Sequence, residues 1–426
     1  MDEVKRIPVG RLRRLARLAR VGTRTGTSLL FSTDGDGAAQ QAAAVLGSMR
    51  GLAAKLGQMA SYVDGLVPET QRAAFEEALK KLRSEAPQSP PDAIRSVVEE
   101  DLGNSLDQLF AQWSPSPFAS ASIGQVHHAV LPDGQEVAVK VQHPGIDAAV
   151  EADLHNGGTL KQLAKALASD DLNADALFDE VATRFREELD YRLEATRQTR
   201  FAKLYPDEPR IVVPRVIDTH SARRVLTSEL AAGMSLEEAA AQPEATRRTY
   251  CEVLWHFAFK AILVDGLFNA DPHPGNYLFH QDGRVTFLDF GCVQELGHHS
   301  LAHSRAAHLA ALHQDRQGFE RAVVRLGNTQ GGAYEEAFRS YLHRCMRPIF
   351  SSPFRITRDF VSGLVQEIFG LNKLALTRDS QIPAVPESTV LLNRLQFGFM
   401  SVLARLNTEV DYAMIERAFF ERAQIT

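Results

Sequence analysis

Apolar and polar residues alternate along Glu136–Gln142, where every second position is valine and Lys140 is one of the intervening residues. Alternation with a period of two is typical of a strand that buries one face. The preceding stretch, Phe118–Leu131, also has strand character, and the turn residues Pro132–Gly134 separate the two. The pattern predicts an antiparallel hairpin with Lys140 on the face opposite the valines.

A second, shorter hairpin is predicted further along the chain. Tyr277–His280 and Arg284–Leu288 have the composition of short strands, and Asp282-Gly283 is a turn dipeptide between them. Asn276 stands just before the first strand and Asp289 just after the second. Pairing of the two strands would therefore bring Asn276 and Asp289 together.

Most other segments follow a helical pattern. Arg247–Val264 is predicted as an apolar helix that leads to the second hairpin, and helices are predicted from about Ser300 onward. Further strands are predicted at Ile211–Val216 and Arg224–Glu229, and a charged helix at Asp175–Lys203. The candidate core of the last segment is Phe397, Phe399, Met400, Val402 and Leu403.

The order of these elements predicts an α+β fold in three parts. Residues 1–109 form a helical extension, residues 110–230 a lobe with a mostly antiparallel sheet, and residues 231–426 a helical lobe. Leu230–Gly233 is the predicted hinge between the two lobes. A chain of 426 residues is long enough for this organisation.

Composition indicates an ordinary globular protein. Hydrophobic residues make up 44% of the chain and charged residues 23%, and the net charge of -6 argues against bulk nucleic-acid binding. The three cysteines form no C-x-x-C pair, which excludes a zinc or disulfide framework and suits a reducing compartment. We find no uninterrupted apolar run of about 18 residues and no signal-peptide pattern, so the expected localisation is cytoplasmic.

The first segment carries an excess of positive charge. Within Arg11–Val21, leucines and alanines fall at helical spacing and leave arginines on the other face, at Arg11, Arg13, Arg14, Arg17 and Arg20. Such a helix can lie on an anionic membrane surface, which would make the protein peripheral. Alternatively, the leucines pack on the main domain and the arginines are solvated. A cleavable mitochondrial presequence is a third interpretation, with the matrix as the destination in a eukaryote.

A helix predicted at about residues 42–63 places polar groups beside glycines. Gly47, Gly51 and Lys55 follow one another at i+4, and Gln58 comes three residues later, so the four share a face. Glycines allow a second backbone to approach closely, and the lysine and glutamine would add polar groups to that contact. The alternative is a packing helix with a surface lysine.

The candidate chemistry lies around the second hairpin. Asp271 is followed by Asn276 and then by Asp289-Phe290-Gly291. Kinase-type phosphoryl transfer uses one aspartate near the attacking group, with an asparagine and a second aspartate on magnesium. An isolated Asp-Phe-Gly carries little information, but its combination with Asp271 and Asn276 across a hairpin predicts such a site.

Lys140 needs a partner if it is buried in its strand. In kinases a strand lysine reaches the α and β phosphates of the nucleotide. The segment Phe185–Glu194 offers three carboxylates, at Glu188, Asp190 and Glu194, and one of them is expected to pair with Lys140. The alternative, a lysine on an edge strand, is disfavoured by the Asp271, Asn276 and Asp289 set.

Two features differ from a protein kinase. The position of the glycine-rich phosphate loop is taken by Ala119, Ser120, Ala121 and Ser122, which are small but stiffer than glycine. After Gly291 there is no Ala-Pro-Glu and no long activation segment, which a protein kinase uses to hold its peptide substrate. Phosphorylation of protein chains in trans is therefore not expected.

Taken together, these motifs resemble the UbiB/AarF family of atypical kinase-like proteins, which includes the mitochondrial ADCK proteins. Lys55-Leu56-Gly57-Gln58 is similar to its K-x-G-Q signature, Glu188-Leu189-Asp190 to its E-x-D motif, and Ala119–Ser122 to its alanine-rich loop. The resemblance covers roughly Pro8 to Leu296. Ser120 departs from the family's usual alanine, and the C-terminal transmembrane segments of bacterial UbiB are missing.

The resemblance implies a two-lobed protein-kinase-like fold that binds ATP or ADP with Mg²⁺, with Mn²⁺ as a second candidate. It implies that Glu194 pairs with Lys140 and that Lys55 and Gln58 lie over the active site against Glu188 and Asp190. Glu229, at the end of the predicted strand, and Ala231 of the predicted hinge are expected to contact the nucleotide. The implied role is support of isoprenoid-quinone biosynthesis or lipid homeostasis, with a lipid or quinone precursor as the acceptor.

Two other functions remain open. A small-molecule kinase of the aminoglycoside or choline type shares the Asp271, Asn276 and Asp289 pattern, but such enzymes lack a K-x-G-Q helix. A nucleotide-dependent scaffold without turnover is the third class, although every catalytic position is present here.

Overall fold

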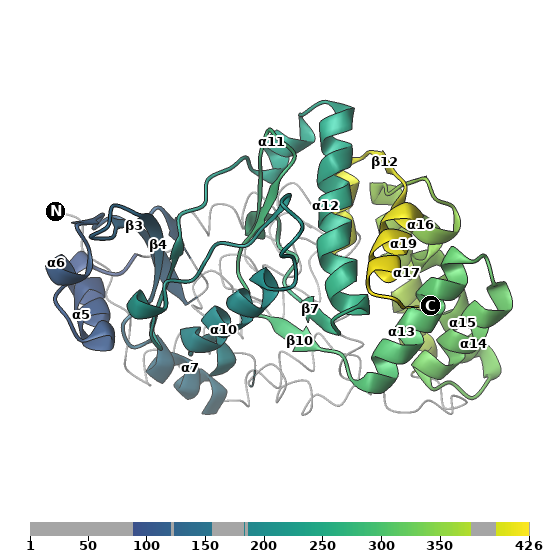
Figure 1. Ribbon diagram of the computed structural model, residues 1–426. Helices are drawn as coiled ribbons and strands as arrows, with labels where there is room; N and C mark the ends of the chain where they lie inside the picture. The colour runs from purple at the N-terminus through teal and green to yellow at the C-terminus, as the bar shows by residue number, and fades with distance from the viewer. Residues whose placement is uncertain (1–87, 121–122, 156–182, 184–185, 376–397, 426) are drawn as a thin grey trace, which may run out of the picture. The chain divides into compact units, whose positions relative to one another are not determined.

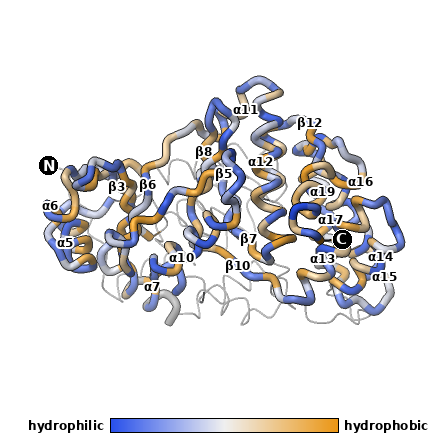
Figure 2. The backbone as a smooth tube through the Cα atoms, viewed as in Figure 1, coloured by the Kyte–Doolittle hydropathy of each residue, from blue (hydrophilic) through white to orange (hydrophobic). Residues whose placement is uncertain are grey.

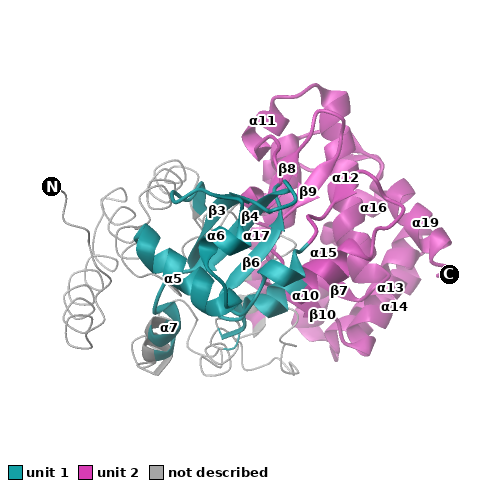
Figure 3. Cartoon of the chain, turned by 60° about the vertical axis from the view of Figure 1, so that its left-hand side comes forward, with its two compact units in different colours: residues 1–62, 66–195, 216–230 teal, residues 63–65, 196–215, 231–426 magenta. Residues whose placement is uncertain are grey.

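The computed structural model describes residues 88–120, 123–155, 183, 186–375 and 398–425. They belong to two compact units (Figure 3). Unit 1 contains residues 88–195 and 216–230, and unit 2 contains residues 196–215 and 231–425, within the described ranges. The predicted features at Arg11–Val21, Lys55 and Gln58, and at Ala121 and Ser122, lie outside the described residues.

Unit 1 is built on an antiparallel sheet with the order β1-β3-β4-β6, and β2 pairs with β3 (Figure 1). The strands are β1 (Gln112–Trp113), β2 (Ala119–Ser120), β3 (Gly124–Val130), β4 (Glu136–Gln142) and β6 (Val225–Glu229). The helical elements are α5 (Pro91–Leu102), α6 (Leu106–Leu109), α7 (Ile146–His155) and the 3₁₀ turn η1 (Asp218–His220). The predicted hairpin is confirmed as β3 and β4, in which Val126 pairs with Lys140.

The alternation along β4 has the expected structural consequence. Val137, Val139 and Val141 are completely buried. They share a core with Ile94 and Val98 of α5, a helix that contacts β4 and β6. Lys140 is therefore on the opposite face of the sheet from this core, because successive side chains of a strand point to opposite faces.

Unit 2 combines short strands with many helices. Its strands are β5 (Ile211–Val212), β7 (Leu267–Asn269), β8 (Tyr277–Phe279), β9 (Val285–Phe287), β10 (Val293–Glu295), β11 (Phe354–Arg355) and β12 (Glu409–Val410). Its helices include α11 (Leu236–Ala240), α12 (Glu244–Leu263), α13 (His298–Leu312), α14 (Arg316–Gly327), α15 (Gly332–Cys345), α16 (Arg347–Phe350), α17 (Arg358–Ala375), a helix over 398–406 and α19 (Tyr412–Arg422). The 3₁₀ turn η2 (Pro274–Asn276) precedes β8.

Helix α12 is the centre of unit 2. Its buried residues include Tyr250, Leu254 and Trp255, and they lie around most of its circumference, as in a helix packed on several sides. Helix α19 packs against it, and β7 contacts its C-terminal half. Figure 2 shows the apolar residues of α12 and β7 in orange. Phe399, Met400, Val402 and Leu403 are buried in the same core, as predicted.

Two predicted elements differ from the structure. The strand predicted at 211–216 is only β5, which pairs in parallel with β9, and Pro214 has no N–H with which to extend the ladder. The charged helix predicted at 175–203 is interrupted: Asp190 is outside helix, and α10 (Tyr191–Ala202) begins after it. Asp190 and Glu194 therefore do not share a face of one continuous helix. Among the helices that the structure describes, none has the length and apolar character needed to span a membrane.

Candidate active site

Lys140 and Glu194 form an ion pair in unit 1. The Nζ atom of Lys140 lies 2.8 Å from Oε1 and 2.9 Å from Oε2 of Glu194. Only 17% of the lysine side chain and 8% of the glutamate side chain are exposed. A charge-assisted bond to both carboxylate oxygens fixes the direction of the ammonium group. Of the three candidate carboxylates, Glu194 is thus the one that pairs with the strand lysine.

Tyr191 also contacts the lysine. The ammonium lies 5.0 Å from the centroid of the Tyr191 ring, within the range of a cation–π interaction, and the tyrosine is 2% exposed. Its hydroxyl lies close to Gly124: a Cβ atom built on Gly124 would be 2.8 Å from that oxygen. The same Cβ would lie 2.3 Å from the carbonyl oxygen of Val141, so Gly124 is needed for this close packing.

The other predicted residues of unit 1 are near the ends of its strands. Ala119 and Ser120 form β2, and they pair with Val126 and Gln125 of β3. Glu229 is the last residue of β6 and accepts a hydrogen bond from the side chain of Gln135 at 3.2 Å. Ala231, by contrast, belongs to unit 2.

Glu188 and Asp190 precede α10. Asp190 accepts hydrogen bonds from the guanidinium of Arg192, at 2.8 and 2.5 Å. These bonds, with the positive charge of Arg192, hold the pKa of Asp190 below its usual value. The predicted contact of Glu188 and Asp190 with Lys55 and Gln58 remains a prediction, since the latter two residues are outside the described ranges.

In unit 2, Asn269 connects the segments that carry Asp271 and Asp289. Its Oδ1 accepts a hydrogen bond from the backbone N–H of Asp271 at 3.1 Å. Its Nδ2 donates to the carbonyl oxygen of Asp289 at 2.8 Å. One half-buried side chain therefore fixes the backbone positions of both candidate aspartates.

Asn276 is placed by the hairpin and by Asp271. Strands β8 and β9 pair in antiparallel fashion, and the N–H of Leu288 donates to the carbonyl of Asn276 at 2.8 Å. Asn276 is thus opposite the residue that precedes Asp289, as the sequence predicts. Its Nδ2 donates to the carbonyl oxygen of Asp271 at 3.0 Å, which leaves its Oδ1 on the other side of the amide.

The Asp289-Phe290-Gly291 segment has a specific backbone conformation. Asp289 has φ of 59°, in the left-handed region, and its Oδ1 accepts from the N–H of Gly291 at 3.1 Å. An aspartate tolerates this region better than most residues because its short carboxylate bonds to nearby backbone. Phe290 is fully buried against Phe201 of α10, with ring centroids 5.1 Å apart.

Residues in the later turns of α10 also contact this segment. Nη1 of Arg197 donates to the carbonyl oxygen of Gly291 at 2.8 Å. Arg200 forms an ion pair with Glu295 of β10. The later turns of α10 are therefore tied to the residues that follow Asp289.

The oxygen donors of Asn276 and Asp289 suit a hard divalent cation. Magnesium prefers carboxylate and amide oxygens, and it keeps water and substrate phosphates as its other ligands. In the described part of the chain, His, Cys, Asp and Glu form no group of three or more that is able to hold a metal ion. A site with one aspartate and one asparagine fits a metal that is bound largely through a nucleotide, and not a cage made only of protein ligands.

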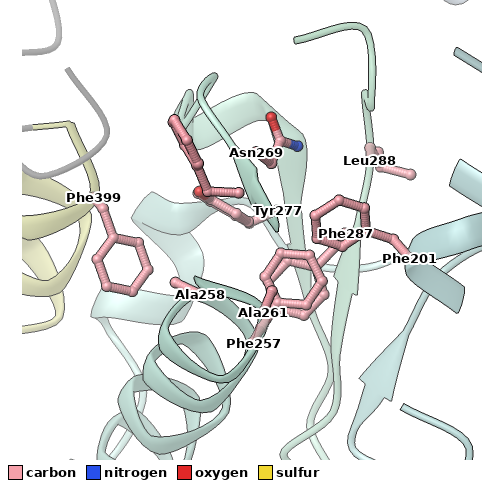
Figure 4. A pocket seen from close by; sticks show the side chains of 10 residues that line it. Phe201, Phe257, Ala258, Ala261, Asn269, Tyr277, Phe287, Leu288 and Phe399 are labelled. Carbon is pink, nitrogen blue, oxygen red and sulfur yellow. The ribbon is translucent and has the colours of Figure 1, made fainter. Parts of the chain in front are cut away.

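A small cavity lies within unit 2 beside Asn269 and Leu288 (Figure 4). Its volume of about 20 Å³ is enough for about one water molecule. Phe257, Ala258 and Ala261 of α12 line it together with Asn269, Leu288 and aromatic side chains, namely Phe201, Phe268, Tyr277, Phe287 and Phe399. Burial, with the charge of Asp271, raises the pKa of the Tyr277 hydroxyl. This space is far too small for a nucleotide. It is a small gap in the packing around Asn269 and Leu288.

The segment that carries these candidate residues matches the sequence model of a known family. The model for the ABC1 atypical kinase-like domain matches residues 81–323, which include both Lys140 and Asp289. The chain belongs to the ABC1 atypical kinase-like family. The α+β kinase-like fold expected from the sequence is thereby confirmed.

Several curated proteins are similar to this chain. The mitochondrial atypical kinase COQ8B of Rattus norvegicus is 32% identical over 378 residues, which is 87% of this chain and 70% of that protein. The mitochondrial atypical kinase COQ8 of Saccharomyces cerevisiae is 26% identical over 377 residues, or 87% of this chain and 74% of that one. The uncharacterized protein sll0005 of Synechocystis is 36% identical over 248 residues, but the chain spans only 35% of its length.

One solved structure is similar over nearly the whole chain. The complex of Rv3197 with erythromycin, from Mycobacterium tuberculosis, superposes with a TM-score of 0.62 at 28% sequence identity. The match covers 96% of this chain and 98% of that one.

The residues that sequence reasoning missed are Asn269, Tyr191 and Arg197. Each acts through a contact with a residue distant in sequence or with a backbone atom, which no local pattern reveals. Asn269 lies two residues before Asp271, and Tyr191 directly follows the Glu188-Leu189-Asp190 motif. This closeness to predicted motifs was the one sign in the sequence that these two residues belong to the site.

Proposed function

We propose that this chain is an atypical kinase or ATPase that binds Mg-ATP or Mg-ADP and that transfers or hydrolyses the γ-phosphoryl group of ATP. The observation that carries this proposal is the double hydrogen bond of Asn269, which joins the backbones of Asp271 and Asp289, the two aspartates that a phosphoryl-transfer site would use. The buried pair of Lys140 with Glu194 supports it. Membership of the ABC1 family supports it too.

Each residue has a role in this proposal. Lys140, held by Glu194, binds the α and β phosphates. Ala119–Ser122 covers the phosphates, and Glu229 and Ala231 contact the base. Asn276 and Asp289 hold Mg²⁺, or Mn²⁺ in its place, and the metal supplies positive charge that offsets the charge of the phosphates.

Asp271 acts on the attacking group. Its carboxylate accepts the proton of the acceptor O–H as the oxygen forms its bond to the γ-phosphorus. The bond from that phosphorus to the bridging oxygen breaks, and its electron pair stays on the β-phosphate of the departing ADP. With water as the acceptor, the product is inorganic phosphate.

The acceptor in this proposal is water or a small or lipid-like hydroxyl compound. After Gly291 the chain continues through β10 directly to α13, without the long segment that holds peptides in protein kinases. The relatives named COQ8 support a role in ubiquinone biosynthesis, with a quinone precursor or another lipid as the acceptor. Arg11–Arg20 would bring the chain to an anionic membrane surface, which salt-sensitive sedimentation with vesicles would test.

A second candidate ligand comes from the solved relative. The structure of that protein is of its complex with erythromycin. Its similarity over 96% of this chain supports testing erythromycin as a ligand here, alongside the nucleotides.

The decisive experiment measures nucleotide binding and turnover together. Mg-ATP and Mg-ADP should raise the melting temperature, since a ligand at a hundred times its Kd stabilises by about 2.7 kcal/mol. Asp289→Asn should abolish the rise, and Asp271→Asn should stop phosphate release while the rise remains. Asp282→Asn, in the exposed hairpin turn, is the matched control and should behave as the unmodified protein. An unchanged rise in Asp289→Asn would refute the metal assignment.

A further inference from the structure

His273 lies between the candidate base and the candidate metal ligand. Its backbone N–H donates to the carbonyl of Asp271 at 2.8 Å, and its carbonyl accepts from the N–H of Asn276 at 2.9 Å. The imidazole is half-buried, so it is not a side chain that only fills the core.

The tautomer of His273 follows from its contact with Gly275. The backbone N–H of Gly275 donates to Nδ1 of His273 at 2.8 Å. Because an amide N–H can only donate, Nδ1 must carry a lone pair, and the imidazole then carries its proton on Nε2. The protonated nitrogen is therefore the one that does not cap the turn.

Gly275 makes room for this placement. A Cβ built on Gly275 would lie 2.9 Å from Nδ1 and 3.0 Å from Cε1 of His273. Any side chain at position 275 would therefore displace the ring. The sequence Pro274-Gly275 both forms the 3₁₀ turn η2 and leaves the imidazole fixed over it.

We propose that His273 is a further catalytic residue, whose Nε2–H donates a hydrogen bond to the phosphoryl group during its transfer. This inference rests on the proposed function. Asp271 takes the proton of the acceptor, the oxygen–phosphorus bond forms, and the leaving oxygen keeps the electron pair of the broken bond; His273 keeps its own proton throughout. A preorganised hydrogen-bond donor at the position of developing charge accelerates such reactions by about 10²–10³-fold.

A purely structural role is the competing explanation, since Nδ1 caps η2 in any case. His273→Asn separates the two roles. Asparagine is a preferred capping residue whose Oδ1 can accept from the N–H of Gly275, but it has no donor at the position of Nε2. Gly275→Ala makes the complementary change: the imidazole group is still present, but the added Cβ moves it from its position.

The test measures three quantities in the full chain. In His273→Asn, phosphate release should fall by about 10²-fold. The melting temperature without ligand and the rise caused by Mg-ADP should be unchanged. Addition of aluminium fluoride to Mg-ADP, which mimics the transferring phosphoryl group, should raise the melting temperature further in the unmodified protein and much less in His273→Asn. Gly275→Ala should lose phosphate release as well.

The outcomes distinguish this inference from the function on which it rests. If His273→Asn releases phosphate at the rate of the unmodified protein, the imidazole is only a cap and the inference is wrong, while the proposed function stands. If His273→Asn loses release and also loses the Mg-ADP response, the residue acts through folding and the inference is equally refuted. If the unmodified protein neither responds to Mg-nucleotide nor releases phosphate, the proposed function itself fails, and this inference with it.

Discussion

A chain of buried hydrogen bonds in unit 1 supports a prediction about stability. The N–H of Ser89 donates to Oε1 of Gln125 at 2.9 Å, and Nε2 of Gln125 donates to Nε2 of His127 at 2.8 Å. Nδ1 of His127 in turn donates to the carbonyl of Ser114 at 2.8 Å. Gln125 is 1% exposed and His127 is completely buried, so water cannot replace a lost partner. This series of hydrogen bonds connects Ser89, near the first described residue, to strand β3.

Gln125→Leu removes the two central hydrogen bonds of this series and is predicted to destabilise unit 1. Leucine fills a similar volume, but the N–H of Ser89 and Nε2 of His127 both lose their partner. An unsatisfied buried polar group costs about 1–3 kcal/mol, so the expected loss is about 2–6 kcal/mol. Domains are stable by only about 5–15 kcal/mol, and this loss is therefore a large share of the total.

The two tryptophans allow unit 1 to be followed by itself. The chain has 2 tryptophans, Trp113 in unit 1 and Trp255 in unit 2. Trp113 stacks on His127 with ring centroids 4.7 Å apart, so its fluorescence reports on this region. Urea unfolding in a Trp255→Phe background should show a lower midpoint for Gln125→Leu. Gln112→Leu, the same change at an exposed position of the same sheet, should shift the free energy of unfolding by less than about 0.5 kcal/mol.

A double-mutant cycle sharpens this test. His127→Phe keeps an aromatic ring against Trp113 but removes the acceptor for Gln125. Since the two residues share one hydrogen bond, the double variant should be more stable than the sum of the single losses predicts, by about 1 kcal/mol or more. Losses below about 0.5 kcal/mol, or strictly additive losses, would refute the reasoning.

The remaining predictions concern pH and the candidate site. Burial lowers the pKa of His127, so the folded state binds fewer protons than the unfolded state. Unit 1 should therefore lose stability as the pH falls from about 6.5 toward that lowered pKa. His127→Phe should flatten the dependence of the urea midpoint on pH. Tyr191→Leu should weaken Mg-ATP affinity about 2- to 5-fold, because a cation–π contact with Lys140 contributes about 0.5–1 kcal/mol, while Tyr191→Phe keeps the ring and should bind normally in the same titration. Asn269→Ala removes two hydrogen bonds and should lower the free energy of unfolding of unit 2 by about 1–3 kcal/mol, together with a fall in the rate of phosphate release; an Asn269→Ala protein with unchanged turnover would show that this link is dispensable.

The sequence by itself determined the local elements of this fold. The valines at every second position of β4 specified a strand with one buried face, and Asp282-Gly283 specified the turn between β8 and β9. Both signals are local, because alternation and turn chemistry depend on residues a few positions apart. For the same reason, the hairpin was enough to predict that Asn276 and Asp289 come together.

Tertiary structure decided which distant groups meet. The residue pattern offered Glu188, Asp190 and Glu194 as partners for Lys140; the break before Tyr191 separates Asp190 from α10 and leaves Glu194 as the partner, as the family resemblance implied. The parallel pairing of β5 with β9 was not visible in the composition of either strand. Asn269 shows the physical reason most directly, since its two hydrogen bonds end on backbone atoms. Any residue has such atoms, so only the folded backbone brings them within reach of that side chain.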